Sequence, residues 1–193
     1  MRTLVLASTS PYRLQLLRQL GLQFHVDAPL FKEEIDQEVA PELQVKHLAH
    51  HKAKSLRERY PDALILGADQ VFVDARGHVL GKPGTAEGAF RQLREMAGRS
   101  HVFYTGVSLF DSASGDSVTD VATYTVTLRS LSDDQIRTYL ERENPLDCAG
   151  SFKIEGLGIA LMKRMAGDDY TALIGLPLTK VIDLLGRFGV EVL

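Results

Sequence analysis

The chain has 193 residues, of which 45 % are hydrophobic, and its formal net charge is -3. That length suits one compact domain, or two small lobes that share a sheet, and supplies enough apolar material for a core. The basic residues form no long stripe and no apolar run approaches membrane length, so neither nucleic acid nor a membrane is an expected partner.

The expected elements alternate between strands and helices. In chain order, the pattern predicts a short buried strand at 4–7, a helix that starts at Pro11 and ends at Gly21, a strand at 22–26, an irregular acidic stretch at 29–41 and an amphipathic helix at 42–60. There follow a strand at 63–69, a hairpin around the turn 74–77, a helix at 85–96, long strands at 102–110 and 118–128, a helix at 132–143, a strand at 159–162 and a helix at 177–188. This order predicts one domain over residues 1–193, an α/β fold with a mixed twisted sheet flanked by helices.

Asp69 is the first candidate for chemistry. It follows Gly67-Ala68 at the carboxyl end of an apolar strand, which is where α/β folds place their ligands. The chain also carries scattered cations, each at the start of a loop or on an apolar face. One acid among several bases suggests a polyphosphate and its metal.

Two of these cations each lie on the apolar face of a different predicted helix. Lys52 lies in phase with Val45 and Leu56, so it needs an anionic partner unless its stem snorkels to water. Arg13 lies in phase with Leu16 in the first turn of its helix, where free backbone N–H groups and the helix dipole attract anions. Both positions favour binding of negative charge.

Other polar segments leave alternatives open. The turn Ser8-Thr9-Ser10 can hold phosphate oxygens or simply cap the next helix. Lys82 is not part of a P-loop, because Pro83 stands where a Ser or Thr would hold magnesium. Cys148, the single cysteine, excludes an internal disulfide, suits a reducing cytoplasm and is expected to be a small buried residue rather than a nucleophile.

Short motifs run in order from the first strand to the last helix. They are Leu6 to Arg13, Glu33, Lys52-Ala53, Gly67 to Gln70, Gly81-Lys82-Pro83, Gly98 with His101, Thr105-Gly106, Ala149 to Gly156 and Gly175 to Leu178. As a set they resemble the Maf family of nucleoside triphosphate pyrophosphatases. The resemblance implies an inosine triphosphatase-like, elongated domain of two lobes with a central cleft. It also implies a homodimer, and cleavage of a nucleoside triphosphate to the monophosphate and pyrophosphate with Mg²⁺ or Mn²⁺ as cofactor.

The resemblance also implies roles for particular residues. Asp69 would be the proton acceptor, and the phosphates would be bound by Ser8, Arg13, Lys52 and Lys82. Glu33 and Asp69 would bind the metal. Lys32 departs from the family, which generally has an acid beside Glu33, and so weakens the case for a metal site with two acids.

Three further residues resemble the branch of the family that acts on 7-methyl-GTP: Tyr12, Gln70 and Glu155. A carboxylate such as Glu155 can accept from both N1–H and the N2 amino group of guanine. Methylation at N7 makes the ring cationic, which favours a carboxylate and an aromatic face such as Tyr12. The expected activity is therefore removal of 7-methyl-GTP before it enters RNA. The alternatives are a dTTP or UTP pyrophosphatase of the same family, and a nucleotide-binding interaction protein linked to cell division arrest.

Overall fold

The structure is a computed structural model and describes residues 2–32 and 38–193. Its strands are β1 (Thr3–Ala7), β2 (His25–Asp27), β3 (Ala63–Val73), β4 (Val79–Leu80), β5 (Ser100–Asp111), β6 (Ser117–Leu128) and β7 (Met162–Ala166). Its α-helices are α1 (Pro11–Arg18), α2 (Pro41–Lys54), α3 (Ala86–Met96), α4 (Asp133–Glu143), α5 (Tyr170–Ile174) and α6 (Leu178–Arg187). Short 3-10 helices occupy Ala149–Ser151 and Leu157–Leu161.

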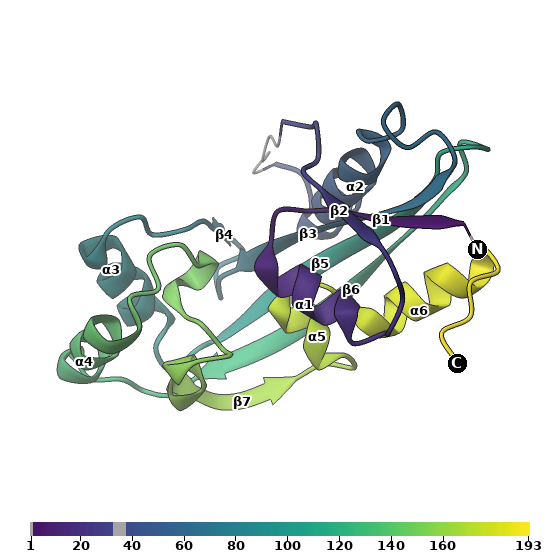
Figure 1. Ribbon diagram of the computed structural model, residues 1–193. Coiled ribbons are helices and arrows are strands. Elements are labelled where there is room, and N and C mark those ends of the chain that lie inside the picture. Colours follow the sequence, from purple (N-terminus) through teal and green to yellow (C-terminus); the bar gives the residue numbers. More distant parts are fainter. Residues whose placement is uncertain (1, 33–37) are drawn as a thin grey trace. The chain divides into compact units, whose positions relative to one another are not determined.

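The described strands form a mixed sheet in the order β2-β1-β3-β5-β6-β7, with β4 paired to β3 (Figure 1). Strand β1 is parallel to both β2 and β3, whereas β3 with β4 and β6 with β7 are antiparallel. The predicted mixed α/β sheet flanked by helices is therefore confirmed. None of the helices within 2–32 and 38–193 has the length and apolar content needed to cross a membrane.

The chain divides into two compact units. The first unit contains Met1–Gln70, Tyr104–Thr123 and Asp169–Leu193, and the second contains Val71–Phe103 and Tyr124–Asp168. Strand β3 contributes residues to both, because the division falls between Gln70 and Val71.

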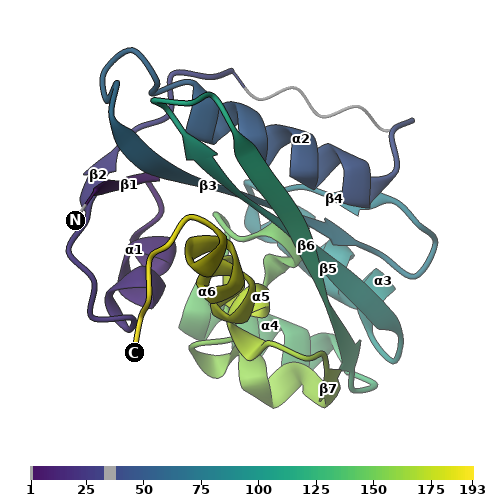
Figure 2. The ribbon, with the colours of Figure 1, turned by 90° about the vertical axis from the view of Figure 1, so that its right-hand side faces the viewer.

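The first unit has apolar layers on both faces of its parallel strands. Because side chains alternate along a strand, Leu4 and Leu6 of β1 join one buried cluster with residues of α1 and α6, whereas Val5 and Ala7 join another with residues of α2. Figure 2 shows the same layers, with α2 on one side of β1 and β3 and with α1 and α6 on the other. Burial on both faces explains why these strands read as continuous apolar runs.

Two glycines let helix α2 approach the sheet closely. A Cβ on Gly67 of β3 would lie 2.2 Å from the carbonyl oxygen of Ala49, and one on Gly106 of β5 would lie 2.3 Å from that of Val45. No side chain fits at either position while the helix backbone stays where it is. The inward face of α2, with Lys52, is thereby held against the middle of β3.

The second unit has an aromatic core. Phe72, Phe103 and Phe152 contact one another, with ring centroids 4.5 to 5.8 Å apart, and His101 lies 5.7 Å from Phe72. Helix α4 begins with the predicted capping box of Ser132 and Gln135. The 3-10 helix Ala149–Ser151 contains Gly150 at a φ of 75°, and a Cβ there would lie 2.7 Å from the Phe72 ring.

Some element boundaries differ from the prediction. The strand predicted at 159–162 is wrong, because that segment is mostly 3-10 helix and the strand begins at Met162. The cause is a tight turn in which the N–H groups of Gly156 and Gly158 both donate to the carbonyl of Lys153. Helix α2 ends at Lys54 rather than near 60, and the sequence analysis did not identify α5 as a separate helix.

Candidate active site

A buried ion pair lies just beyond the carboxyl end of β1, on its neighbour β3. The strand predicted at 63–69 continues to Val73, so Asp69 lies inside β3 and not at its end, two residues after the last pairing with β1. The Lys52 ammonium of α2 donates to Oδ1 of Asp69 on β3 over 2.6 Å, and the two residues are only 5 % and 6 % exposed. The inward position predicted for Lys52 is confirmed, and its anionic partner is Asp69. Because a buried charge is costly unless it is paired, the ion pair holds both side chains in a fixed orientation.

Ser8 and Arg13 follow the adjacent strand β1. Ser8 is buried just beyond Ala7, which pairs with Gly67, so Ser8 and Asp69 extend from the same end of neighbouring strands. Its Oγ accepts the N–H of Ser10, and Ser10 in turn caps α1. Both the capping role and a phosphate-binding role were open for this turn, and the structure shows capping by Ser10.

Arg13 is held by the turn after α5. Its Nε donates to the carbonyl oxygen of Gly175 over 2.8 Å. Gly175 has a φ of 123°, a conformation that favours glycine. This hydrogen bond helps to fix the direction of the Arg13 side chain. Tyr12, one residue earlier, is 39 % exposed.

Gln70 lies next to Asp69 and its amide is bound to the protein itself. Its Nε2 donates to Oγ1 of Thr105 and to the carbonyls of Ala172 and Leu173, at distances of 2.8 to 3.2 Å. The buried Thr105 hydroxyl also donates to Ala172. Gln70 thus connects the strand that carries Asp69 to helix α5, which is a positioning role in addition to the predicted role in specificity.

Asp169 is a residue that the sequence analysis missed. It is 8 % exposed, and its carboxylate accepts the N–H and hydroxyl of both Thr171 and Thr179, so it caps α5 and binds the first turn of α6. Burial alone would raise the pKa of Asp169, but these hydrogen bonds outweigh burial and lower it. The spacing Asp-x-Thr at a helix start is a capping signal that could have been found in the sequence.

The other predicted site residues belong to the second unit. Lys82 is exposed in the loop between β4 and α3. Glu155 is also exposed, in the loop between the two 3-10 helices. Glu33 lies outside the described residues. The structure therefore brings Ser8, Arg13, Lys52, Asp69 and Gln70 into one unit, and Lys82 and Glu155 into the other.

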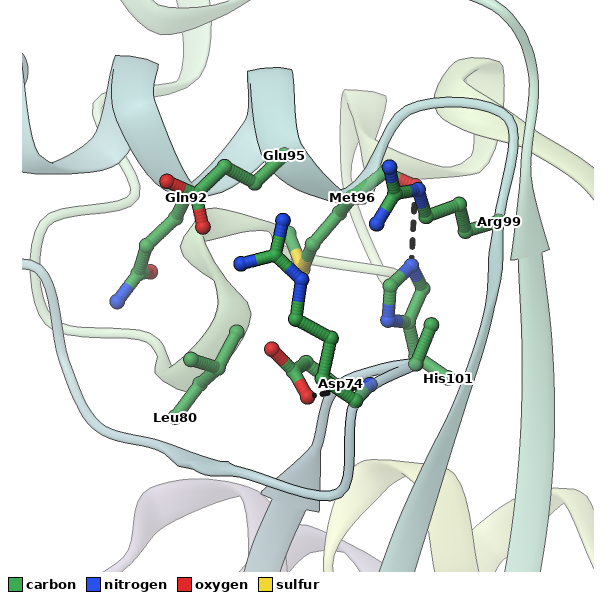
Figure 3. A pocket seen from close by; sticks show the side chains of 9 residues that line it. Asp74, Leu80, Gln92, Glu95, Met96, Arg99 and His101 are labelled. Carbon is green, nitrogen blue, oxygen red and sulfur yellow. Dashed lines mark hydrogen bonds between the residues drawn. The ribbon is translucent and has the colours of Figure 1, made fainter.

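The second unit contains a small polar pocket, shown in Figure 3. It is lined in part by Asp74, Gln92, Glu95, Met96, Arg99 and His101. The His101 ring donates from Nε2 to the Met96 carbonyl over 3.0 Å, and its buried Nδ1 has no hydrogen-bond partner within 2–32 and 38–193. Burial lowers the pKa of His101, so the ring is neutral. The cavity of about 20 Å³ holds one water molecule and excludes a nucleobase.

Two further observations concern metal ligands and the single thiol. In the part of the chain that the structure describes, no three His, Cys, Asp or Glu side chains gather as a ready-made metal site. Cys148 is half-buried, and burial together with Asp147 raises the pKa of its thiol to about 11. A thiol with that pKa is a poor nucleophile at neutral pH.

Comparison with known proteins identifies the family of this chain. The family described as Maf-like protein matches residues 3–188, and the chain belongs to that family. A relative from Syntrophotalea carbinolica is 69 % identical over 193 residues, which is all of this chain and 98 % of the relative, and is named 7-methyl-GTP pyrophosphatase. A relative of the same name from Methylobacillus flagellatus is 48 % identical over the full length of both chains.

Among solved structures, the Ham1 protein of Staphylococcus aureus is similar to this chain. The matched region spans 81 % of this chain and 89 % of the Ham1 chain. It is 14 % identical, with a TM-score of 0.46. At that level the likeness carries no argument about the site.

Proposed function

We propose that this protein is a nucleoside triphosphate pyrophosphatase that hydrolyses 7-methyl-GTP to 7-methyl-GMP and pyrophosphate, and so removes the modified nucleotide before it enters RNA. The observation that carries the proposal is the buried pair of Lys52 and Asp69, on β3 just beyond the carboxyl end of the neighbouring strand β1. The full-length relatives named for this activity support the choice of substrate.

In this mechanism Asp69 is the general base. Its carboxylate takes a proton from the water that attacks the α-phosphorus, and the bond to the β-phosphate oxygen breaks as pyrophosphate leaves. Lys52 orients that carboxylate through its hydrogen bond to Oδ1. We assign Lys52 to a phosphate oxygen as well, because an ammonium carries three donors and the family resemblance implies this role.

The remaining cations bind the triphosphate. Arg13 carries its guanidinium in the first turn of α1, where the helix dipole also favours an anion. Ser8 supplies a hydroxyl at the same strand end. Lys82 is assigned to the phosphates as well, by its place in the family motif.

A divalent metal, Mg²⁺ or Mn²⁺, belongs to the same proposal. Mg²⁺ is usually held by one or two carboxylates together with the phosphates of the substrate, and Asp69 provides one such carboxylate. The position of Asp69 beside Lys52, a proposed phosphate ligand, fits a metal held by a carboxylate and substrate phosphates. Glu33 is the proposed second ligand. The metal would supply charge neutralisation on the phosphates. We further propose that the active protein is a cytoplasmic homodimer, as the family resemblance implies.

Specificity is assigned to Glu155 and Tyr12. The Glu155 carboxylate is exposed and so can reach a substrate, and it suits the two donors on the Watson–Crick edge of guanine. The half-exposed ring of Tyr12 suits the cationic face of a base methylated at N7.

The test is side-by-side turnover of 7-methyl-GTP, GTP, UTP and dTTP with Mg²⁺ or Mn²⁺, followed by pyrophosphate release. We expect the highest kcat/KM for 7-methyl-GTP. A clear preference for UTP or dTTP would replace the substrate assignment and keep the reaction. Absence of release from all four would leave a nucleotide-binding interaction protein as the better description.

A further inference from the structure

The loop that carries Glu155 is held at two points by helix α4. On one side of Glu155, the backbone N–H of Lys153 donates to the Tyr139 hydroxyl over 3.1 Å. On the other side, the backbone N–H of Leu157 donates to Oε2 of Glu143 over 2.7 Å. Glu155 lies between these two anchored residues, and all five belong to the second unit.

Glu143 makes the closer of these two contacts. It is the last residue of α4, it is half-buried, and its own carbonyl also accepts from Nζ of Lys153 over 3.4 Å. A hydrogen bond from a backbone N–H to a carboxylate is stronger than one to a neutral acceptor. Glu143 therefore restrains the loop on both sides of Glu155.

Gly156 makes this contact possible. A Cβ on Gly156 would lie 2.6 and 2.7 Å from the two carboxylate oxygens of Glu143, so the carboxylate occupies the space that a side chain would need. Glu155 is the exposed residue beside this glycine and presents its carboxylate to solvent. The loop thus has a fixed backbone and one exposed acid.

We propose that Glu143 is a positioning residue for base recognition: it fixes the loop so that the Glu155 carboxylate meets the guanine edge in one geometry. This inference rests on the proposed function, which assigns Glu155 to the base. Loss of the Glu143 carboxylate leaves the chemistry at Asp69 in place, because that group belongs to the other unit. It therefore lowers discrimination between bases more than it lowers the rate of phosphate chemistry.

The experiment compares Glu143→Ala, Glu143→Gln and the wild type by kcat/KM for 7-methyl-GTP and for UTP. For Glu143→Ala we expect the ratio of the two values to fall about tenfold, the effect of losing one charge-assisted hydrogen bond. Glutamine keeps an oxygen that accepts the Leu157 N–H, so Glu143→Gln should retain the ratio within about threefold. Glu141→Ala, which removes an exposed acid from the same helix, is the matched control and should retain the ratio.

Each outcome decides between the claims. A wild type without preference for 7-methyl-GTP overturns the proposed substrate and this inference with it. A wild type that prefers 7-methyl-GTP, combined with a Glu143→Ala variant of unchanged ratio, overturns the role of Glu143 alone. An equal fall of kcat/KM for both nucleotides means a merely structural role and also overturns it.

A second variant covers failure of Glu143→Ala to fold. Tyr139→Phe keeps the buried ring and removes only the hydroxyl that accepts from Lys153. We expect it to lower the ratio of 7-methyl-GTP to UTP in the same direction, by about threefold, as one neutral hydrogen bond is lost. An unchanged ratio in that variant would contradict the proposal.

Discussion

The two units present their candidate site residues in opposite ways. In the first unit, Asp69 and Lys52 are buried and joined to each other, and Gln70 is bound to backbone carbonyls of α5. In the second unit, Lys82 and Glu155 are exposed on loops. The first unit fixes its functional groups by packing and by buried hydrogen bonds, whereas the second fixes a loop backbone and leaves the side chain in solvent.

This difference has a physical reason. A general base needs one geometry, and burial with a hydrogen bond to a neighbouring side chain gives it. A group that recognises a base must instead reach the substrate, so it stays exposed and depends on a restrained backbone. Substitutions at the buried pair of Lys52 and Asp69 should therefore change rate or stability, and those in the loop of Glu155 should change selectivity.

The largest expected effect is that of Asp69→Asn. Asparagine keeps an oxygen for Lys52 but is a far weaker base, so kcat for 7-methyl-GTP should fall by about 10² to 10⁴. Pyrophosphate release gives the rate, and thermal unfolding verifies that the variant is folded. Asp116→Asn changes an exposed acid of the same unit and is the control. Full activity in Asp69→Asn would remove Asp69 from its assigned role.

Gly67→Ala tests whether close packing of α2 holds the ion pair. The new Cβ would meet the Ala49 carbonyl oxygen, so the helix must move, and overpacking of this kind costs about 1–3 kcal/mol of unfolding free energy. Urea unfolding measures the loss, and kcat should fall with it because Lys52 moves with the helix. Gly186→Ala on α6, where nothing lies within 4 Å, should instead stabilise the protein by about 0.8 kcal/mol. Equal stability of the two variants would contradict the packing argument.

Glu155→Gln tests whether a substitution in the second unit changes base selectivity and leaves stability unchanged. Replacing one acceptor oxygen with a donor opposes the N–H groups of guanine, so the ratio of kcat/KM for 7-methyl-GTP over UTP should fall about tenfold or more. The unfolding free energy should stay within about 0.5 kcal/mol, as expected for an exposed residue. A fall in unfolding free energy without a change in the kcat/KM ratio would mean that Glu155 contributes to stability and not to base recognition.

Arg2→Ala has the smallest expected effect and separates stability from activity within the first unit. Arg2 forms a bidentate pair with Asp111, which holds the pKa of that carboxyl well below its usual range. Because the pKa is lower in the folded than in the unfolded state, the pair stabilises the fold above pH of about 4 and loses its effect as the pH falls further. Arg2→Ala should therefore cost about 1 kcal/mol at pH 7 and less in acid. Denaturant titrations at several pH values measure this, and kcat should not change.

The sequence predicted much of this arrangement because local signals agreed with the packing. The apolar run that ends at Gly67 gave β3, and helical phase gave the inward position of Lys52. Thr85 and the pair of Ser132 and Gln135 marked helix starts that the structure confirms. Pairing of Lys52 with Asp69 is a contact between elements, which sequence spacing alone does not specify.

Contacts between distant segments account for the rest. The carbonyls of Ala172 and Gly175 are backbone groups, so their bonds to Gln70 and Arg13 have no signature in residue type. The segment 157–161 looks apolar enough for a strand, but repeated glycines let it turn back on Lys153 instead. Glu143 carries no signal of its own, because its role depends on where α4 places it.

The single thiol of Cys148 has a practical consequence for labelling. With its pKa at about 11, only about one molecule in ten thousand carries the thiolate at pH 7. A cysteine introduced on an exposed loop, for example beside Lys82, ionises to the ordinary extent and reacts far faster with a maleimide. A fluorescent reporter can therefore be attached at a chosen site while the native cysteine stays in place, so each unit can be followed separately during turnover.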